Sequence, residues 1–361
     1  MKIGVPRERK VMEGRVGLTP EACAELIHAG HQVYVEHGAG LLSGYSDEKY
    51  RETGAVVVDS AEQLYEQSVL IVKVKEPVES DLRYIQAHHL IFSFLHLAAN
   101  KDLADQLVVS GCTAIAFETV ENNHGHRILL SPMSQIAGRL AVQIGTNLLH
   151  QPNGGRGVLL GGVSNADRGQ VVVLGAGVAG EQSACLAANM GAQVTLFDVN
   201  TEKLSRMQQA HKQITTQYAY ANSIEESLKM ADLVVGAVLI PDKHAPKIVT
   251  EDMVRSMQEK SVIVDIAIDQ GGCVETMRPT NYQDPTFLCH DVIHFGVTNM
   301  PGAVPRTASQ ALSSAITPSV HKIASLSWEN DEFLSKAVNI RSGEVVLPAL
   351  VEEFGRKETN N

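Results

Sequence analysis

The sequence has few of the features that mark a membrane, secreted or nucleic-acid-binding protein. Its longest apolar stretches, such as residues 233–240, are far too short to cross a bilayer. The first residues lead directly into a strand-like segment without the pattern of a signal peptide, so we expect no targeting segment. The 5 cysteines are widely spaced and form no CxxC pair, which disfavours a disulfide framework and favours a reducing compartment, the cytoplasm.

Positive charge and metal-ligand patterns are scarce as well. Lys and Arg together number 30 against 41 Asp and Glu, which gives the 361-residue chain a formal net charge of −11. Such a surface repels phosphate backbones, so we expect no nucleic-acid partner, and the short apolar runs argue equally against a membrane partner. The histidine pairs at residues 88–89 and 124–126 have no cysteine or carboxylate nearby at zinc spacing, and we expect no metal site.

What the sequence does contain is a regular alternation of strand and helix patterns. In the first 130 residues the expected strands are residues 2–5, 32–36, 55–59, 69–74, 90–94 and 113–117. A helix is expected to begin at Pro20 with Thr19 as its N-cap, and further helices are expected at residues 60–67 and 101–110. This order is typical of a parallel sheet flanked by helices.

The second half shows the same alternation. A helix over residues 131–148, with an apolar residue at every fourth position, leads through a glycine-rich loop into a buried strand at residues 171–174. Further strands are expected at residues 194–197, 233–238 and 261–265, with one more formed from residues 287–289 and 291–295. Helices are expected at residues 202–210 and 223–230 and from residue 307 onward. The sequence therefore predicts an α/β protein with two mostly parallel sheets.

The turn after residues 171–174 carries a G-x-G-x-x-G motif. The motif follows a strand directly and precedes a helix, and Asp198 ends the next strand, which is the context of a dinucleotide-binding fingerprint. Gly175 permits the tight turn, Gly177 lets backbone approach a pyrophosphate at the helix N-terminus, and Gly180 lets helix and strand pack closely. Because the Asp198 carboxylate accepts hydrogen bonds from ribose hydroxyls and repels a 2′-phosphate, we expect NAD rather than NADP as the cofactor.

Several charged or titratable residues lie at turns or at the ends of expected strands. Arg15 stands in a glycine-bounded turn, whereas Lys75 and His96 each close an apolar strand. Asp269 follows an expected strand at residues 263–268 and precedes Gln270 and two glycines. Cations, together with a group that titrates near neutrality, suit an anionic substrate whose protons must move. Each residue has an ordinary alternative as well: a surface cation, a paired lysine, a histidine with satisfied hydrogen bonds or a turn acid.

Blocks spread over almost the whole chain resemble the alanine dehydrogenase family. In the family's order they are residues 4–8, 15–20, 74–77, 94–98, 131–134, 137–138, 175–180, 233–241, 264–272 and 299–307. The chain is thereby identified as a member of the wider alanine dehydrogenase and transhydrogenase α-subunit family. Two places depart from the family pattern: residues 164–169 lack the expected proline–glycine loop, and Gly17 stands where alanine is expected.

The resemblance implies an activity and a set of site residues. The activity is the reversible, NAD-dependent oxidation of L-alanine to pyruvate and ammonium. Arg15 and Lys75 would hold the substrate carboxylate, and His96 and Asp269 would form the catalytic pair. The residues implied to bind NAD are Ser134, Gly175, Gly177, Val178, Ala179, Gly180, Asp198, Lys203, Val238, Leu239, Ile266, Asp269, Asn299 and Met300. By its position alone, Lys203 lies either near the adenosine or, together with Arg206, on a solvated helix face.

The resemblance also implies an architecture and an assembly. Two Rossmann-like domains, each a mostly parallel sheet flanked by helices, would enclose the active site in the cleft between them. The substrate domain would be discontinuous, formed by residues 1–129 and 309–361, and residues 130–308 would form the NAD domain. The protein would be a cytoplasmic homohexamer that binds L-alanine, pyruvate and ammonium.

Three other functions stay open at this point. A lysine-forming saccharopine dehydrogenase is similar over the same halves, but it needs room for a larger amino-acid adduct. The NAD-binding component of a proton-pumping transhydrogenase would require a membrane partner. A non-catalytic NAD-binding protein would have no use for the retained Arg15, Lys75, His96 and Asp269. The formation of NADH with a panel of amino acids would separate these functions.

Overall fold

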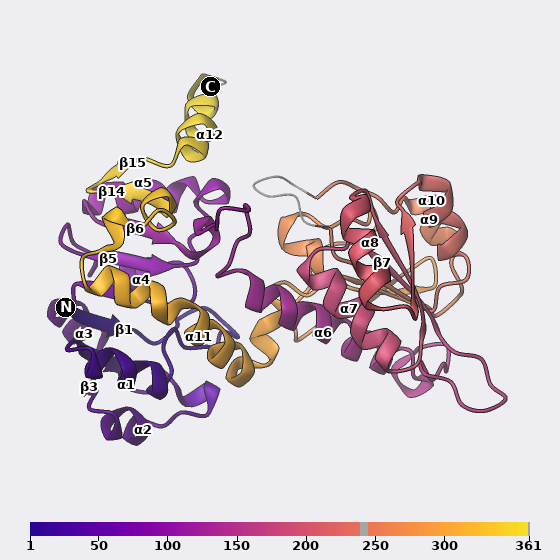
Figure 1. The fold of residues 1–361 in the computed structure, drawn as a ribbon, viewed down its shortest axis with the longest axis horizontal. Coiled ribbons are helices and arrows are strands. Elements are labelled where there is room, and N and C mark those ends of the chain that lie inside the picture. The colour runs from indigo at the N-terminus through magenta and orange to yellow at the C-terminus, as the bar shows by residue number, and fades with distance from the viewer. Residues whose placement is uncertain (239–244, 360–361) are drawn as a thin grey trace. The chain divides into compact units, whose positions relative to one another are not determined.

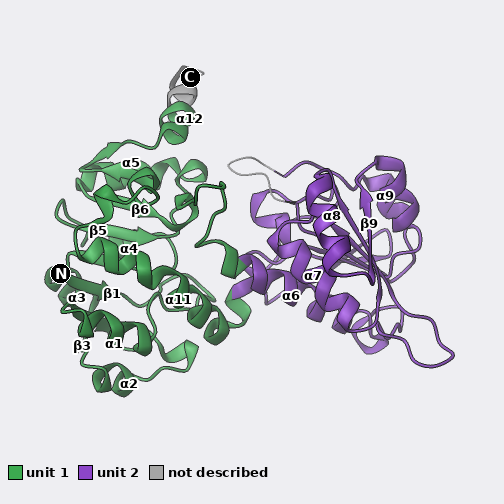
Figure 2. Ribbon diagram, in the orientation of Figure 1, with its two compact units in different colours: residues 1–133, 302–361 green, residues 134–301 purple. Residues whose placement is uncertain are grey.

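The computed structural model describes residues 1–238 and 245–359 and divides into two compact units (Figure 2). Unit 1 contains Met1–Met133 and Gly302–Asn361, and unit 2 contains Ser134–Pro301. The chain therefore leaves unit 1 and returns to it. The domain limits expected from the sequence, 129/130 and 308/309, fall within seven residues of these divisions.

Unit 1 is built on an eight-stranded sheet in the order β15-β14-β6-β5-β4-β1-β2-β3 (Figure 1). Strands β1 to β6 are parallel, β14 is antiparallel to β6, and β15 is antiparallel to β14. The strands are β1 (Lys2–Val5), β2 (Gln32–Glu36), β3 (Val56–Val58), β4 (Leu70–Val72), β5 (Leu90–Ser93), β6 (Thr113–Ala116), β14 (Val338–Arg341) and β15 (Glu344–Val345). The six strands expected in this half are present, and the late pair β14 and β15 extends the sheet at one edge.

Capping residues fix the beginnings of several helices of unit 1. The Ser60 hydroxyl accepts a hydrogen bond from the Gln63 amide at the start of α3, and the Asn100 side chain caps α5 in the same way. Helices α3 and α5 pack on an apolar cluster under β3 to β6, while α1 and α11 contact each other and β2 or β4. The helices are α1 (Pro20–His28), α2 (Asp47–Glu52), α3 (Ala61–Gln67), α4 (Glu79–Leu82), α5 (Lys101–Ser110), α11 (Pro305–Ala324) and α12 (Pro348–Thr359).

Unit 2 has a seven-stranded sheet in the order β12-β13-β11-β10-β7-β8-β9. Its strands are β7 (Gln170–Leu174), β8 (Gln193–Asp198), β9 (Ile214–Tyr218), β10 (Leu233–Gly236), β11 (Val262–Asp265), β12 (Thr286–Cys289) and β13 (Val292–Phe295). The single late strand expected from the sequence is wrong: two antiparallel strands form, because His290 and Asp291 take positive φ angles of 51° and 57° and turn the chain. The polar edge strand β9 was not predicted.

The helices of unit 2 cover both faces of this sheet. Side chains alternate along β7, so Val172 packs in the cluster formed with α9 and α10, whereas Val173 faces α7. The helices are α6 (Ser131–Leu148), α7 (Val178–Asn189), α8 (Thr201–Ala210), α9 (Ala221–Leu228) and α10 (Glu251–Arg255). Gly138 of α6 has no room for a side chain, because an added Cβ would stand 2.1 Å from the Ala179 carbonyl oxygen. Helices α6 and α7 therefore pack closely through glycine.

Each sheet reverses its strand order at one point. In unit 1 the reversal lies between β4 and β1, and in unit 2 it lies between β7 and β10. At such a point the chain leaves neighbouring strands in opposite directions, which opens a crevice outside their carboxyl ends where α/β proteins bind ligands. The candidate residues are therefore expected beyond the carboxyl ends of the strands on either side of these two points.

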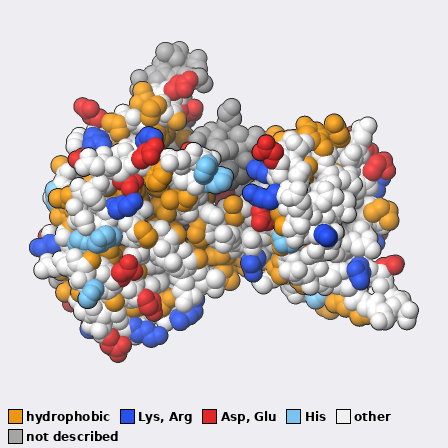
Figure 3. Space-filling view, in the orientation of Figure 1, with side chains coloured by type: hydrophobic (Ala, Val, Ile, Leu, Met, Phe, Trp, Pro, Cys, Tyr) orange, Lys and Arg blue, Asp and Glu red, His pale blue; other side chains and the backbone are white. Residues whose placement is uncertain are grey.

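On the face drawn in Figure 3, Lys and Arg side chains are interspersed with Asp and Glu side chains over unit 1. Within the described ranges, every helix is either too short or too polar to traverse a lipid bilayer.

Candidate functional site

Arg15 lies in the loop after β1 and is almost completely buried. Its side chain is 2% exposed and forms a two-point ion pair with Glu13, through Nε to Oε1 at 2.7 Å and Nη2 to Oε2 at 2.5 Å. Its Nη1 lies 3.2 Å from Met133 Sδ. The alternative of a surface cation is therefore wrong: a buried guanidinium is held in a fixed orientation at the end of β1.

Helix α11 shapes the loop that carries Arg15. The Ser309 hydroxyl accepts a hydrogen bond from the Val16 amide at 2.9 Å, and the Ser313 hydroxyl accepts one from the Thr19 amide at 3.0 Å. These serines lie nearly 300 residues away in the sequence but belong to the same unit. The return of the chain to unit 1 thus completes the surroundings of Arg15.

A buried ion cluster lies beneath Lys75, at the end of β4. The fully buried Lys73 ammonium is 2.8 Å from Asp81 Oδ2 and 3.6 Å from Glu8 Oε2. Burial alone would lower the pKa of Lys73, but the carboxylates of Glu8 and Asp81 outweigh it and raise this pKa. Burial raises the pKa of the Glu8 carboxyl, whose Oε1 also accepts the Val74 amide at 2.6 Å. The cluster fixes the backbone from which the half-buried Lys75 projects.

His96 follows β5 in a left-handed backbone conformation, with a φ of 49°. The Glu118 carboxylate holds this turn by accepting the His96 amide at 2.6 Å and the Leu95 amide at 3.2 Å. The imidazole Nδ1 lies 3.9 Å from the same carboxylate, and the ring stacks on Phe94 with centroids 5.8 Å apart. The side chain is 48% exposed, so His96 is not the buried, satisfied histidine that the sequence left open.

Four chemically useful side chains thus follow four neighbouring strands of unit 1. The strands are β1, β4, β5 and β6, and the residues after them are Arg15, Lys75, His96 and Glu118. Glu118 was missed in the sequence, although it stands directly after an expected strand, as Lys75 and His96 do. Together the residues offer two cations, an imidazole and a carboxylate at one edge of the sheet.

In unit 2 each glycine of the G-x-G-x-x-G turn meets a different requirement. Gly175 has a φ of 100°, which only glycine adopts readily. A Cβ on Gly180 would stand 1.7 Å from the Gly175 carbonyl oxygen. Gly177 is different: among the residues that the structure describes, no atom lies within 4 Å of where its Cβ would stand. The space above Gly177 is therefore open to a ligand, while the other two glycines satisfy the fold itself.

The surroundings of this turn fit a dinucleotide. Gly177 is the N-cap of α7 and has no side chain to cap the first turn, which leaves backbone N–H groups and the positive end of the helix dipole at this point. Asp198 ends the adjacent β8, where its carboxylate accepts the amides of Ala176 at 2.6 Å and Asn200 at 2.7 Å. A pyrophosphate at α7 and a ribose near Asp198 would each meet groups of suitable charge.

The remaining expected cofactor residues of unit 2 lie on several elements. Val238 follows β10, and the Ala237 carbonyl oxygen would lie 2.7 Å from a Cβ on Gly175. Val178 and Ala179 open α7, and Ser134 lies in α6. Leu239 lies outside the described residues. Lys203 is half-buried on α8, whereas Arg206 is exposed and pairs with Glu181 at 3.2 Å.

Asp269 lies in a 3-10 turn, Ile266–Gln270, directly after β11. Its exposed carboxylate accepts a hydrogen bond from the Asn299 amide at 3.1 Å, and Asn299 itself has a φ of 57°. The Met300 side chain is buried, and its carbonyl oxygen accepts the Tyr282 hydroxyl at 2.9 Å. Burial and the charge of Asp269 raise the pKa of Tyr282 to about 12, so this phenol stays protonated at neutral pH.

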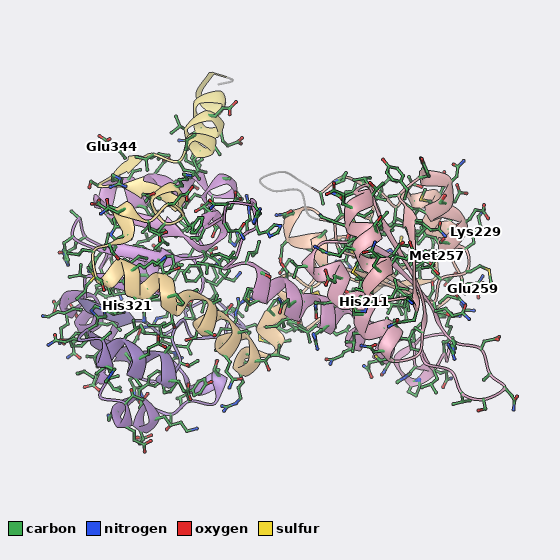
Figure 4. All side chains as sticks on the ribbon, viewed as in Figure 1. His211, Lys229, Met257, Glu259, His321 and Glu344 are labelled. Atoms are coloured by element: carbon green, nitrogen blue, oxygen red, sulfur yellow. The ribbon has the colours of Figure 1, made fainter. Side chains whose placement is uncertain are left out.

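Metal-ligand groups and cysteine pairs are sparse. Among the residues that the structure describes, no group of three or more His, Cys, Asp or Glu side chains is arranged to hold a metal ion. Cys185 on α7 lies 3.3 Å from Nε2 of His211, which is labelled in Figure 4, and all 5 cysteines are free thiols.

These features define a two-domain α/β protein in which one unit has a nucleotide-binding fold and the other carries charged side chains after its strands. Residues 4–137 match the family model described as the N-terminal domain of alanine dehydrogenase/PNT, and residues 141–348 match that of its C-terminal domain. The chain belongs to the alanine dehydrogenase/PNT family.

Individual relatives agree with this assignment. The chain is 44% identical over 359 residues to the alanine dehydrogenase of Mycolicibacterium smegmatis, which covers 98% of this chain and 97% of the relative. A solved L-alanine dehydrogenase superposes with a TM-score of 0.96 and 45% identity over 99% of both chains. The transhydrogenase of Sinorhizobium meliloti superposes with a TM-score of 0.85 and 25% identity, covering 97% of this chain and all of the other.

Proposed function

We propose that this protein is an NAD-dependent L-alanine dehydrogenase, which oxidises L-alanine reversibly to pyruvate and ammonium. The observation that carries the proposal is the set of side chains after β1, β4 and β5 of unit 1, in a chain that resembles alanine dehydrogenases over its full length. A buried guanidinium, a lysine and an accessible imidazole match what a small amino acid requires: an anchor for its carboxylate and a group that moves its protons.

Arg15 and Lys75 are proposed to bind the substrate carboxylate. The ion pair with Glu13 fixes the guanidinium plane, and Nη1 lies against Met133 Sδ, a weak acceptor that a carboxylate oxygen can replace. Lys75 would supply a point charge from the end of the neighbouring strand. A carboxylate that leaves water for such a site needs both contacts, because an unpaired buried charge is costly.

His96 is proposed to move protons. The substrate ammonium must lose a proton before the Cα hydrogen can leave as hydride, and His96 accepts that proton at its imidazole. Loss of the hydride leaves an iminium, and water adds to it with release of a second proton. The carbinolamine then collapses to pyruvate and ammonium when its nitrogen takes that proton back. Glu118 orients the imidazole through the backbone of His96. NAD, when bound, supplies the hydride acceptor.

Asp269 is proposed to complete the catalytic pair. Its exposed carboxylate can stabilise the cationic iminium or orient the attacking water. The hydrogen bond from the Asn299 amide holds one oxygen and restricts the side chain to one region of the loop.

The cofactor is proposed to be NAD, held along the carboxyl edge of the sheet in unit 2. The residues that would hold it are Ser134, Gly175, Gly177, Val178, Ala179, Gly180, Asp198, Lys203, Val238, Leu239, Ile266, Asp269, Asn299 and Met300. The open space over Gly177 and the carboxylate of Asp198 support this assignment, since the first admits a pyrophosphate and the second disfavours a 2′-phosphate. We further propose that the protein is a cytoplasmic homohexamer.

The decisive experiment measures NADH formation by the purified protein with NAD and a panel of L-amino acids. We expect L-alanine to react fastest, with weak activity on serine or glycine. Comparable rates with glutamate, lysine or leucine would contradict the proposed substrate. Reduction of NAD by no amino acid would leave the transhydrogenase-like function as the better interpretation.

A further inference from the structure

Asp265, the last residue of β11, is a buried carboxylate that binds two separate parts of the chain. Its Oδ1 accepts the Ala267 amide at 3.0 Å and lies 3.7 Å from the Cys273 thiol. Its Oδ2 accepts the Cys273 amide at 2.8 Å and the Val274 amide at 3.3 Å. Residue 267 lies near the start of the loop 266–272, whereas 273 and 274 follow its end. One side chain therefore closes this loop at both ends.

The loop that Asp265 closes carries the proposed catalytic carboxylate. After the 3-10 turn Ile266–Gln270, Gly271 and Gly272 take positive φ angles of 90° and 74° and lead the chain back toward β11. Asp269 projects from this turn and is exposed, with one oxygen fixed by the Asn299 amide. The position of Asp269 thus depends on the closure of the loop.

Neighbouring residues leave space for the Asp265 side chain. Gly236 lies beside it on β10, where a Cβ would stand 2.6 Å from Cys273 Sγ and 3.0 Å from Asp265 Oδ1. A Cβ on Gly272 would stand 2.8 Å from Asp265 Oδ2. Burial raises the pKa of Asp265, and the amide donors of Cys273, Ala267 and Val274 offset part of this effect. Glycines on two sides and amides on both oxygens make this a specific carboxylate site.

We propose that Asp265 is a positioning residue for the reaction, which holds Asp269 in its working place by closing the loop 266–272. This inference rests on the proposed function, because it takes Asp269 as a member of the catalytic pair. The chemistry favours aspartate over asparagine. Both oxygens face backbone N–H donors, so an asparagine would turn its own NH₂ group toward at least one of them.

The first test compares Asp265→Asn with Cys273→Ala in the full-length protein. Asp265→Asn should lower kcat for alanine oxidation by about 10–100-fold, because small displacements of a catalytic group are costly. The KM for alanine should change by less than about threefold, since the proposed carboxylate anchors belong to unit 1. Cys273→Ala removes the thiol contact but keeps all the amide bonds, and it should retain kcat within about twofold.

A double-mutant cycle separates positioning from a general structural role. If Asp265 acts through Asp269, then adding Asp265→Asn to Asp269→Asn should lower kcat by less than about twofold further. An equal loss of kcat in both backgrounds would overturn the proposal, as would full kcat in Asp265→Asn alone.

Hydrogen exchange distinguishes failure of this inference from failure of the proposed function. In Asp265→Asn the amides of residues 267, 273 and 274 should exchange at least about 10-fold faster, whereas those of β7 and β8 should not change. This result would stand even if the wild-type protein oxidised no alanine, and unchanged exchange would overturn the loop closure itself. If Asp265→Asn does not fold, Gly272→Ala gives the same readouts, because its methyl group clashes with Asp265 Oδ2 while the carboxylate remains. Normal kcat and normal hydrogen exchange in Gly272→Ala would then overturn the proposal.

Discussion

The two units present functional groups at the same edge of similar sheets but hold them by different means. In unit 1 buried ion pairs hold two of these groups: Glu13 fixes Arg15, and Lys73 joins Glu8 to Asp81 beneath the end of β4, whereas Glu118 holds the turn at His96 through backbone amides. In unit 2 the carboxylates of Asp198, Asp265 and Asp269 are bound by backbone amides. Buried ion pairs therefore contribute to the site of unit 1, whereas the site of unit 2 depends mainly on backbone amides.

This difference between the units predicts that they respond to different kinds of substitution. Removing one partner of a buried ion pair strongly destabilises the folded protein, because the other charge stays buried and unpaired. A site made from backbone amides depends on the path of the chain, so an added methyl group at a glycine should disturb it more than the loss of a distant charge. The substitutions below test this contrast, beginning with the one that should cost the most stability.

Lys73→Met should have the largest effect. It leaves the buried carboxylates of Glu8 and Asp81 without their shared cation, and it should lower the free energy of unfolding by about 3–5 kcal/mol. Urea unfolding measures this loss. The matched control is Lys336→Met in the same unit, which removes an exposed pair with Glu332 and should leave stability unchanged. If the two variants were equally stable, the ion cluster would not organise unit 1.

Gly180→Ala tests the backbone-built site of unit 2. Its methyl group would collide with the Gly175 carbonyl oxygen, so the turn must shift, at a cost of about 1–3 kcal/mol or more in stability, and NAD binding should be lost. Calorimetric titration with NAD and urea unfolding measure the two effects.

Gly177→Ala is the matched variant, because its methyl group enters open space. The cost in stability should be no more than about 1 kcal/mol, the loss expected for alanine at an N-cap. NAD binding should nevertheless weaken at least about 10-fold, because the methyl group occupies the approach to the helix N-terminus. Wild-type affinity for NAD in this variant would remove Gly177 from the proposed cofactor site.

The strength of the local signal explains what could be predicted from the sequence. Strand ends after apolar runs were predicted, and with them Lys75, His96, Asp269 and the glycine turn. Arg15 was singled out in a glycine-bounded turn before a helix. Strand β9 was missed because it is a polar edge strand whose Thr215, Thr216 and Gln217 are not fully buried. Such a segment has no apolar run to distinguish it from a loop.

The partners of the site residues were not predictable in the same way. Lys73 and Lys75 are two residues apart, and either could be the lysine that faces a ligand. Only the fold brings Glu8 and Asp81 to Lys73 and leaves Lys75 half-buried. Asp265 likewise resembles any acid at a strand end until the chain returns to it eight residues later. Pairings between distant residues carry no periodicity that a single sequence displays.

Substitutions of the two proposed anchors should affect substrate and not cofactor. Arg15→Lys keeps a positive charge but loses the planar fork, so kcat/KM for alanine should fall by about 10–100-fold, mainly through KM. Lys75→Ala should lower kcat as well, if its ammonium also stabilises the oxygen that develops in the carbinolamine. Steady-state kinetics gives both values, and the Kd for NAD should remain within about twofold of wild type.

A purely raised KM in Lys75→Ala, with unchanged kcat, would reduce Lys75 to a ground-state anchor. Full activity of this variant at low alanine would remove it from the site. If either anchor substitution weakened NAD binding strongly, the division of labour between the units would be wrong.

Asp198→Ala should have a smaller effect, on the cofactor and not on alanine, and it also removes the acceptor of the Ala176 and Asn200 amides. The ribose hydroxyls lose an acceptor, and the repulsion of a 2′-phosphate disappears, so NAD should bind about 10-fold more weakly and the preference over NADP should narrow. Titrations with both dinucleotides measure this, and the KM for alanine is the internal control. Equal use of NADP by the unaltered protein would show that this carboxylate does not set the preference.

The smallest expected effect concerns one buried histidine in each unit. In unit 1, Nδ1 of His89 accepts a hydrogen bond from the Gln86 amide at 2.8 Å, and Nε2 donates one to the Tyr65 carbonyl oxygen at 3.0 Å. In unit 2, His294 donates from Nδ1 to the Val292 carbonyl oxygen, and its Nε2 pairs with the Thr276 hydroxyl at 2.8 Å. Burial lowers the pKa of both imidazoles, and the neighbouring His88 and His290 add to this.

Both histidines should therefore weaken the fold in acid, but not equally. The pKa of each histidine in the folded protein lies below its value of about 6.5 in the unfolded chain, so the unfolded chain takes up the proton first. The free energy of unfolding therefore falls as the pH drops below about 6.5, by at most about 1.4 kcal/mol per pH unit for each histidine. A proton on His89 Nδ1 would face the Gln86 N–H, whereas the Thr276 hydroxyl can rotate to accept one from His294. Urea unfolding at pH 7.5 and 5.5 should show that His89→Asn removes more of the acid sensitivity than His294→Asn does, with the exposed His124→Asn retaining the wild-type response. The reverse order would mean that protonation is penalised by burial alone and not by the fixed amide that faces His89.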